Sequence, residues 1–233
     1  MFVGIGTVIN VIAIILGAAL GVLMGNKIAE KTRNLMTDVL GAITLIGAAS
    51  AIASLWRDDL MSAVPDGFPI LIVLGSLLIG GLIGSILHIE DRLESWGLSL
   101  KQRFDKRGDS PFVEGFVTAS LIFVIGPLAI LGSISDGMSN GIDQLALKSA
   151  LDFFAALAFA AALGWGVALS ALPVGIYQGI WSLIGFGLGS ILEDYQVSAM
   201  TATGGVLLLG IGLKLLAIKN IAIGNLLPSL AIA

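Results

Sequence analysis

Seven apolar runs, each close to the length that a helix needs to cross a lipid bilayer, alternate with short charged segments in this chain. A hydrocarbon core about 30 Å thick requires about 20 residues of helix. None of the runs alternates apolar and polar residues as the strands of a membrane barrel do. The sequence therefore predicts an all-α, polytopic membrane helix bundle. The runs are residues 2–24, 39–56, 68–87, 115–134, 153–172, 174–192 and 197–213.

An eighth apolar segment, residues 221–233, is short and contains Pro228. Proline lacks a backbone donor and disfavours the interior of a helix. Three outcomes stay open for this segment: a marginal span, a re-entrant turn, or a position at the membrane interface. We therefore expect seven or eight transmembrane helices in a single transmembrane domain, residues 1–233.

The composition supports an integral membrane protein, since 57% of the 233 residues are hydrophobic and only 12% are charged. Soluble globular domains carry about 25% charged residues. The N-terminus, MFVGIG, lacks the basic segment of a cleavable signal peptide. We expect the first apolar run to remain in the membrane as a helix.

Lysine and arginine concentrate in alternate loops, after the first, third and seventh runs. Short loops rich in these residues lie on the cytoplasmic side. The pattern predicts an external N-terminus and an external turn at 193–195. The third loop, residues 88–111, also has apolar residues at helical spacing, which predicts an amphipathic helix on the anionic inner leaflet.

A small-xxx-small motif occurs near the end of three runs, and such motifs allow membrane helices to pack closely. We interpret the chain as three helix hairpins, about residues 4–56, 68–134 and 174–213, with a helix at 146–172 inserted before the third. The insertion reverses the third hairpin relative to the others, as in the inverted repeats of secondary transporters. We expect these glycines at helix contacts and a homo-oligomer, most simply a dimer. The glycines are Gly17, Gly21, Gly80, Gly84, Gly185 and Gly189.

Lys148 and Asp152 are the charged residues that lead into the fifth apolar run. Residues four apart share one face of a helix. A carboxylate at such a position is costly in lipid and usually faces a protein interior or a watery cavity. The pair is thus a candidate for a solute or ion pathway. The alternative is an interfacial salt bridge whose lysine extends to water.

The dipeptide Gly126-Pro127 interrupts the fourth run. Proline leaves a backbone carbonyl of the preceding turn without its usual donor. Such a carbonyl can coordinate a cation or a polar solute where it lines a cavity. A kink that a nearby serine or threonine satisfies is the alternative. The further polar candidates inside apolar runs are Asn10, Ser120, Ser133 and Gln178.

Several functional classes find little support in the sequence. The chain has one histidine, His88, and no cysteine. We therefore expect no metal centre, no Ser-His-Asp triad and no cofactor, and we do not expect an enzyme. No basic and aromatic surface suggests nucleic acid as a partner. The predicted function is transport, as a transporter or channel for a small solute or ion. The alternative is a non-transporting membrane scaffold or partner subunit.

Several segments of the sequence resemble those of a known family. They are VIGPLAILGSISDGMSNG, LALKSALDFFAALAFAAALGWGVALSALPVGIYQG, GGVLLLGIGLKLL and NLLPSLAIA. Together with GTVINVIAIILGAALG near the start, they resemble the uncharacterised bacterial inner-membrane family that includes YqgA and YdfK. This resemblance covers nearly the whole chain. It implies a bacterial cytoplasmic membrane, and it implies no established substrate or activity.

Overall fold

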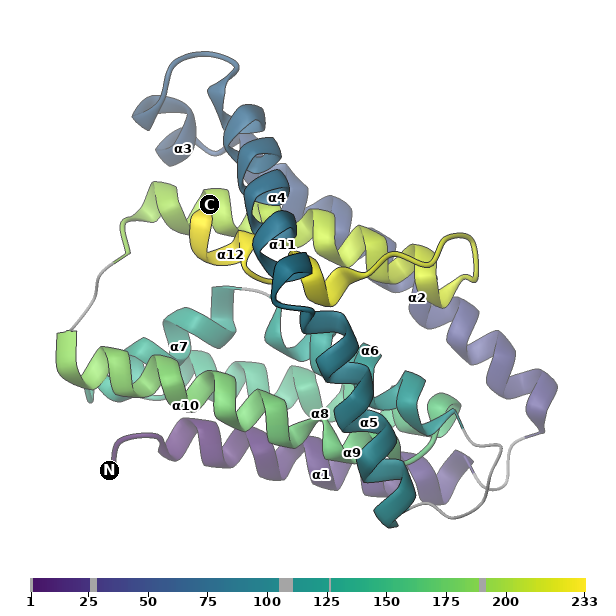
Figure 1. The fold of residues 1–233 in the computed structure, drawn as a ribbon. Coiled ribbons are helices and arrows are strands. Elements are labelled where there is room, and N and C mark those ends of the chain that lie inside the picture. The colour runs from purple at the N-terminus through teal and green to yellow at the C-terminus, as the bar shows by residue number, and fades with distance from the viewer. Residues whose placement is uncertain (1, 26–28, 105–110, 126, 189–191) are drawn as a thin grey trace. The chain divides into compact units, whose positions relative to one another are not determined.

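The computed structural model describes residues 2–25, 29–104, 111–125, 127–188 and 192–233, and within these ranges the protein is helical and has no strand. Figure 1 shows the helices. They are α1 (Ile5–Gly25), α2 (Glu30–Ile52), the 3-10 helix η1 (Ala53–Trp56), α3 (Asp58–Ala63), α4 (Phe68–Ile86), α5 (Ile89–Phe104), α6 (Phe112–Val124), α7 (Pro127–Gly137), α8 (Asp143–Leu163), α9 (Gly166–Leu169), α10 (Ala171–Leu188), α11 (Asp194–Leu215), the 3-10 helix η2 (Ile223–Leu226) and α12 (Ser229–Ile232).

Six helical stretches in the described ranges are long and apolar enough to cross a bilayer, and the bent pair α6–α7 makes a seventh if it counts as one span. The prediction of a multi-pass helical membrane protein is therefore confirmed. The eighth apolar segment forms only η2 and α12. Its ten residues from Ile223 to Ile232 extend about 15 Å as helix, about half of a hydrocarbon core. This segment is therefore shorter than the six span-length helices, and its place in the membrane stays open.

The contacts divide the chain into two compact units. Unit 1 comprises residues 1–38, 94–124 and 128–191, and unit 2 comprises residues 39–93, 125–127 and 192–233. Each unit is thus built from segments that are distant in the sequence. The three-hairpin repeat and the inverted sense of its third member remain predictions.

In unit 1, α1 and α8 run parallel and pack closely along their lengths (Figure 1). Gly17, Gly21 and Gly25 lie against the backbone carbonyls of Phe153, Leu157 and Ala161, in that order. A Cβ atom at any of the three glycines would meet a carbonyl oxygen at well under 3.0 Å. Glycine is required because only the absence of a side chain lets the two backbones approach so closely.

Helix α10 runs antiparallel to α1 in the same unit. Thr7 of α1 meets Ser182 of α10, and Val11 lies beside Gly175. The loop charges predict that the first and sixth spans cross the membrane in opposite directions. The antiparallel arrangement of α1 and α10 agrees with this prediction. The side of the membrane on which the N-terminus lies remains a prediction.

The fourth apolar run is broken, as Gly126-Pro127 suggests: α6 and α7 meet at an angle of 63°. Helix α7 begins at Pro127, and proline suits a first helical position because its missing N–H is not needed there. The break leaves α7 only 11 residues long. It packs on α10, where Gly185 lies against the backbone of Ile134.

The boundary expected for the inserted helix, residues 146–172, differs from the structure. Helix α8 begins at Asp143 and ends at Leu163, because Gly164 adopts a positive φ of 82°. Glycine adopts such a backbone conformation far more readily than other residues, and the helix cannot continue through it. Asp152 is consequently the tenth of the 21 residues of α8, near its middle rather than near its end.

Unit 2 is organised around α11, which contacts α3, α4, η1, η2 and α12. The C-terminal segment packs on α4: Gly84 lies against the backbone of Asn225, and Gly80 against that of Ser229. Gly80 and Gly185, which the predicted repeat aligns, therefore each pack on the backbone of a short helix. Gly189 lies outside the described residues. The other five glycines singled out by the sequence are used for packing inside the chain.

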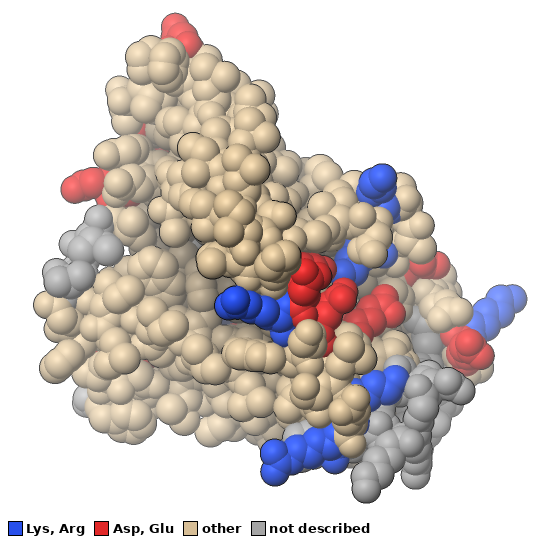
Figure 2. Space-filling view, viewed as in Figure 1, with Lys and Arg blue, Asp and Glu red and all other residues tan. Residues whose placement is uncertain are grey.

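The outward surfaces of α4 and α10 are strongly apolar. Leu82, Ile86, Leu183 and Phe186 each expose at least 66% of their surface. Large exposed apolar patches on a protein mark contact with lipid or with another protein. Figure 2 likewise shows broad areas without any charged side chain. A lipid bilayer is the environment that these surfaces require.

The orientation can be tested directly because the chain contains no cysteine. Single cysteines at Asp194, the first residue of α11, and at Lys31, in the first turn of α2, should react with a membrane-impermeant maleimide from opposite sides. We expect Asp194→Cys to react in intact cells and Lys31→Cys only after the membrane is opened. The opposite result would overturn the predicted orientation.

Candidate functional site

Lys148 and Asp152 form an ion pair inside unit 1. The Lys148 Nζ donates to Asp152 Oδ2 at 2.6 Å, and the two side chains are 8% and 9% exposed. Their spacing of four residues on α8 brings the charged ends together on one helix face. The aspartate is too deep in the helix for its short side chain to reach water at either end. The pair is thus buried inside the unit.

Asn10 joins this pair from α1. Its Nδ2 donates to Asp152 Oδ2 at 2.9 Å. An ionised carboxylate only accepts hydrogen bonds, so the amide nitrogen must be the atom that faces it. The Asn10 side chain is fully buried, and its Oδ1 has no hydrogen-bond partner among the described residues. The amide group that donates to Asp152 therefore also carries an unused hydrogen-bond acceptor, Asn10 Oδ1.

Gln178, on α10, has an amide group with no partner at either atom among the described residues. Both Gln178 Oε1 and Nε2 are buried without a partner in the described part of the chain. Gln178 shares a helix face with Gly175 and Ser182, which meet Val11 and Thr7 of α1. Along α10, Gln178 therefore lies between the two residues that contact α1, and these contacts fall on either side of Asn10 in α1.

Helix α6 closes another side of this cluster. The ring of Phe123 lies 5.9 Å from Lys148 Nζ, within the range of a cation–π contact. Thr118, also on α6, is buried, and its Oγ1 has no partner among the described residues. Four helices of unit 1 thus contribute buried polar side chains, which we call together the Asp152 cluster. It consists of Asn10, Thr118, Lys148, Asp152 and Gln178.

The remaining predicted pathway residues have local roles. Ser120 Oγ donates to the carbonyl of Phe116, and Ser133 Oγ donates to that of Ala129, each at 2.6 Å. Such bonds within one helix satisfy the hydroxyl and leave little to offer a ligand. Gly126 lies outside the described residues, and for Pro127 only the backbone is described. Their proposed role in coordination remains a prediction.

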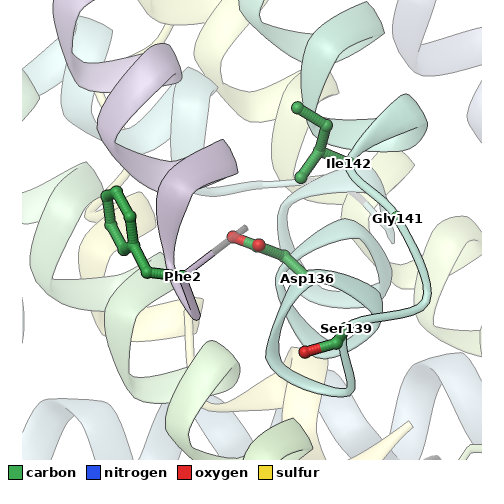
Figure 3. Close-up of a pocket in the computed structure, with 5 residues that line it drawn as sticks. All are labelled: Phe2, Asp136, Ser139, Gly141 and Ile142. Carbon is green, nitrogen blue, oxygen red and sulfur yellow. The ribbon is translucent and has the colours of Figure 1, made fainter.

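A cavity of about 140 Å³ opens at the start of α1 and α8 (Figure 3). Its lining includes Asp136, from the end of α7, and Ser139. Asp136 is 4% exposed, and its Oδ2 accepts a hydrogen bond from the backbone N–H of Gly6 at 3.0 Å. A carboxylate is stabilised at the N-terminal end of a helix such as α1. Sequence reasoning missed Asp136, because Ser-Asp-Gly after a short apolar run is typical of a solvent loop.

Leu145 separates this cavity from the Asp152 cluster along α8. It is fully buried, and a Cβ at Gly6 would lie 2.6 Å from its Cδ1. Leu145 follows the cavity residue Ile142 by three positions and precedes Lys148 by three, so it neighbours Lys148 on the helix surface. Along α8, Leu145 therefore lies between the cavity and the ion pair.

Unit 2 contains a second, partly buried ion pair that sequence reasoning also missed. Glu90 Oε1 accepts from Lys214 Nζ at 3.3 Å, and Glu90 Oε2 accepts from the backbone N–H of Gly224 at 2.5 Å. The backbone N–H of Glu90 donates to Asn225 Oδ1 at 2.9 Å. The contacts link α5, α11 and the C-terminal segment. We read this group as a structural link, since both carboxylate oxygens of Glu90 have partners.

Replacing Glu90 with alanine should loosen the C-terminal segment, because it removes the acceptor of the buried Gly224 N–H and the counter-charge of the half-buried Lys214. A buried donor left without a partner costs about 1–3 kcal/mol. Hydrogen–deuterium exchange should therefore rise across residues 221–233. Asp91→Ala is the matched control, because the Asp91 side chain is 71% exposed on the same helix. Equal exchange in the two variants would show that Glu90 does not hold this segment.

Within the described ranges, no group of three or more histidine, cysteine, aspartate or glutamate side chains could hold a metal ion. The Asp152 cluster is accordingly a site of one cation, one anion and neutral polar groups. Such a set can bind a polar ligand by hydrogen bonds and ion pairs.

Comparisons with known proteins agree with a membrane protein of unknown function. The chain is 32% identical over 228 residues to the uncharacterized membrane protein YdfK of Bacillus subtilis, covering 97% of this chain and 93% of that protein. It is 29% identical over 233 residues to the uncharacterized protein YqgA of Escherichia coli, covering 98% and 94%. No solved structure matches the chain at a significant level. The pattern described as protein of unknown function DUF554 matches residues 5–233, and the chain therefore belongs to the DUF554 family.

Proposed function

We propose that the protein is a transporter or channel for a small solute or ion in the bacterial cytoplasmic membrane, and that the Asp152 cluster lies on its pathway. One observation carries this proposal: a buried ion pair at mid-helix, bonded to Asn10, whose amide oxygen has no partner among the described residues. Ionisable groups at such depth usually mark pathways for ions or substrates.

In a purely structural link, we would expect every buried polar atom to have a hydrogen-bond partner. Buried polar atoms in folded proteins are nearly always hydrogen-bonded, and each exception calls for an explanation. The Glu90 group in unit 2 meets that expectation, since both of its carboxylate oxygens are bonded. Asn10 Oδ1 and the whole amide of Gln178 do not. Groups that must bind a passing ligand are expected to be left available in this way.

The Asp136 cavity supplies a route to the cluster. It lies at the end of unit 1 that the predicted orientation places outside, and Leu145 separates it from Lys148. A solute entering there would reach the ion pair once Leu145 moved aside. Along α8, Leu145 and Asp152 are seven residues apart, which corresponds to about 10 Å.

Cysteine accessibility tests the proposal in the intact protein. Ser149 is buried between Lys148 and Asp152 in sequence, Ser139 lines the Asp136 cavity, and Ser76 is buried in unit 2. In a pathway, a cysteine at Ser149 should react with a small charged methanethiosulfonate reagent, more slowly than Ser139→Cys. The control Ser76→Cys should stay unreactive until the protein is denatured.

The alternative function, a non-transporting scaffold or partner subunit, predicts a dry interior. In that case Ser149→Cys would be as unreactive as Ser76→Cys in the native protein, while both would react fully in denaturant. This outcome would remove the proposed pathway.

A further inference from the structure

We propose that the ligand of the Asp152 cluster is a small zwitterion, a molecule that carries one ammonium group and one carboxylate. This inference rests on the proposed function and adds the chemical class of the solute. It follows from the charges and the hydrogen-bonding groups that the cluster presents.

The balance of charge is the first argument. The described cluster contains one cation, Lys148, and one anion, Asp152, in direct contact. Burying a charge without a partner is costly, whereas a well-paired set of charges can be nearly neutral in energy. A lone cation at Asp152 would compete with Lys148, and a lone anion at Lys148 would compete with Asp152. A zwitterion that separates the two gives each a new partner and leaves the site without net charge.

The free hydrogen-bonding groups are the second argument. An ammonium group needs acceptors, and Asn10 Oδ1 and Gln178 Oε1 are both available. A carboxylate needs donors, which the lysine ammonium and the unpartnered Gln178 Nε2 of α10 can supply. The cluster thus offers unused groups of both kinds, as a ligand with two opposite charged ends requires. A simple metal cation would use the acceptors and leave the amide donor unsatisfied.

Lys148 can make room for such a ligand. Its side chain is long and flexible, and its ammonium lies against the Phe123 ring, whose face favours a cation. Asp152 is held in place by Asn10. We therefore expect the lysine to shift along the ring when the ligand binds, while the aspartate stays in position. The cavity of about 140 Å³ at Asp136 sets the scale of the entrance and favours a small molecule.

The test uses the purified full-length protein and a panel of probes, the twenty common amino acids. Binding is measured by thermal shift, and uptake by radiolabelled probe in proteoliposomes. For the best probe, its methyl ester supplies the ammonium without the carboxylate, and its N-acetyl form supplies the carboxylate without the ammonium. We expect the wild-type protein to prefer the zwitterion over both by about a hundredfold, since each analogue leaves one buried charge unpaired.

Two variants should change this preference in opposite directions. Asp152→Asn retains the lysine charge, so it should lose the zwitterion preference and accept the N-acetyl form. Lys148→Gln retains the carboxylate, so it should accept the methyl ester instead. If either variant does not fold, the selectivity of the wild-type protein alone decides the question.

The failure of this inference differs from the failure of the proposed function. An open pathway at Ser149→Cys with no binding of any zwitterion in the panel would overturn the ligand class and leave transport standing. If the wild-type protein bound a single-charge analogue as tightly as the zwitterion, the proposed ligand class would be overturned as well. A closed pathway at Ser149→Cys would remove the function on which the inference depends.

Discussion

Replacing Gly84 with alanine should strongly impair folding, although it adds only one methyl group. In α4 that methyl would overlap the backbone oxygen of Asn225, closer than real Cβ atoms ever come. A backbone cannot move aside as a flexible side chain can. Overpacking a well-filled interior typically costs about 1–3 kcal/mol, and we expect the upper end of that range or more. The measurements are the yield of folded protein and its thermal unfolding temperature.

Gly75 offers the matched control on the same helix, because a Cβ there would meet nothing within 4 Å. Gly75→Ala should fold at least as well as the wild type, since alanine is a better helix former than glycine. In unit 1, Gly185→Ala and Gly179→Ala form a second pair with the same contrast. If the two members of each pair were equally stable, the close backbone contacts would have no part in the fold.

The second large effect concerns the ion pair on α8. Asp152→Ala should lower the free energy of unfolding by about 3–5 kcal/mol, because Lys148 remains buried without its partner. Asn10 also loses the acceptor of its Nδ2. Chemical denaturation in mild detergent measures the change.

A double variant, Lys148→Met with Asp152→Leu, should recover most of that loss. Replacing a buried ion pair by apolar residues of similar size is often neutral or stabilising. If the double variant were as unstable as Asp152→Ala, the cost would come from lost packing or from Asn10, not from an unpaired lysine. The double variant therefore separates the structural contribution of the pair from its contribution to transport.

The sequence predicted the helical spans well because hydropathy over about 20 residues is a strong physical signal. It also indicated the break at Gly126-Pro127, since proline cannot continue a helix without loss. The end of α8 was placed wrongly for a clear reason. Gly164 and Gly166 lie inside an unbroken apolar run, so no change of polarity marks the break. It depends on Gly166 packing against the backbone of Phe112, which only the fold reveals.

The candidate site was predictable in part. The spacing of Lys148 and Asp152 indicated a pair on one helix face, and Asn10 and Gln178 were recognised as polar residues within apolar runs. Their grouping depends on which helices are neighbours, and the parallel packing of α1 on α8 has no signature in one sequence. Asp136 and Glu90 were missed because both border loops, where a charged residue is ordinarily solvated. Burial by distant segments, such as Gly6 and Gly224, turns them into interior groups.

The most direct test of the central claim compares transport by the wild-type protein and by the stable double variant in proteoliposomes. The panel includes labelled amino acids, small polyols and inorganic ions reported by flux dyes. Our account predicts uptake of at least one small polar solute or ion by the wild type, and background uptake by the Lys148→Met, Asp152→Leu variant at equal thermal stability. Equal uptake by both proteins, or uptake by neither, would contradict a transport role for the Asp152 cluster.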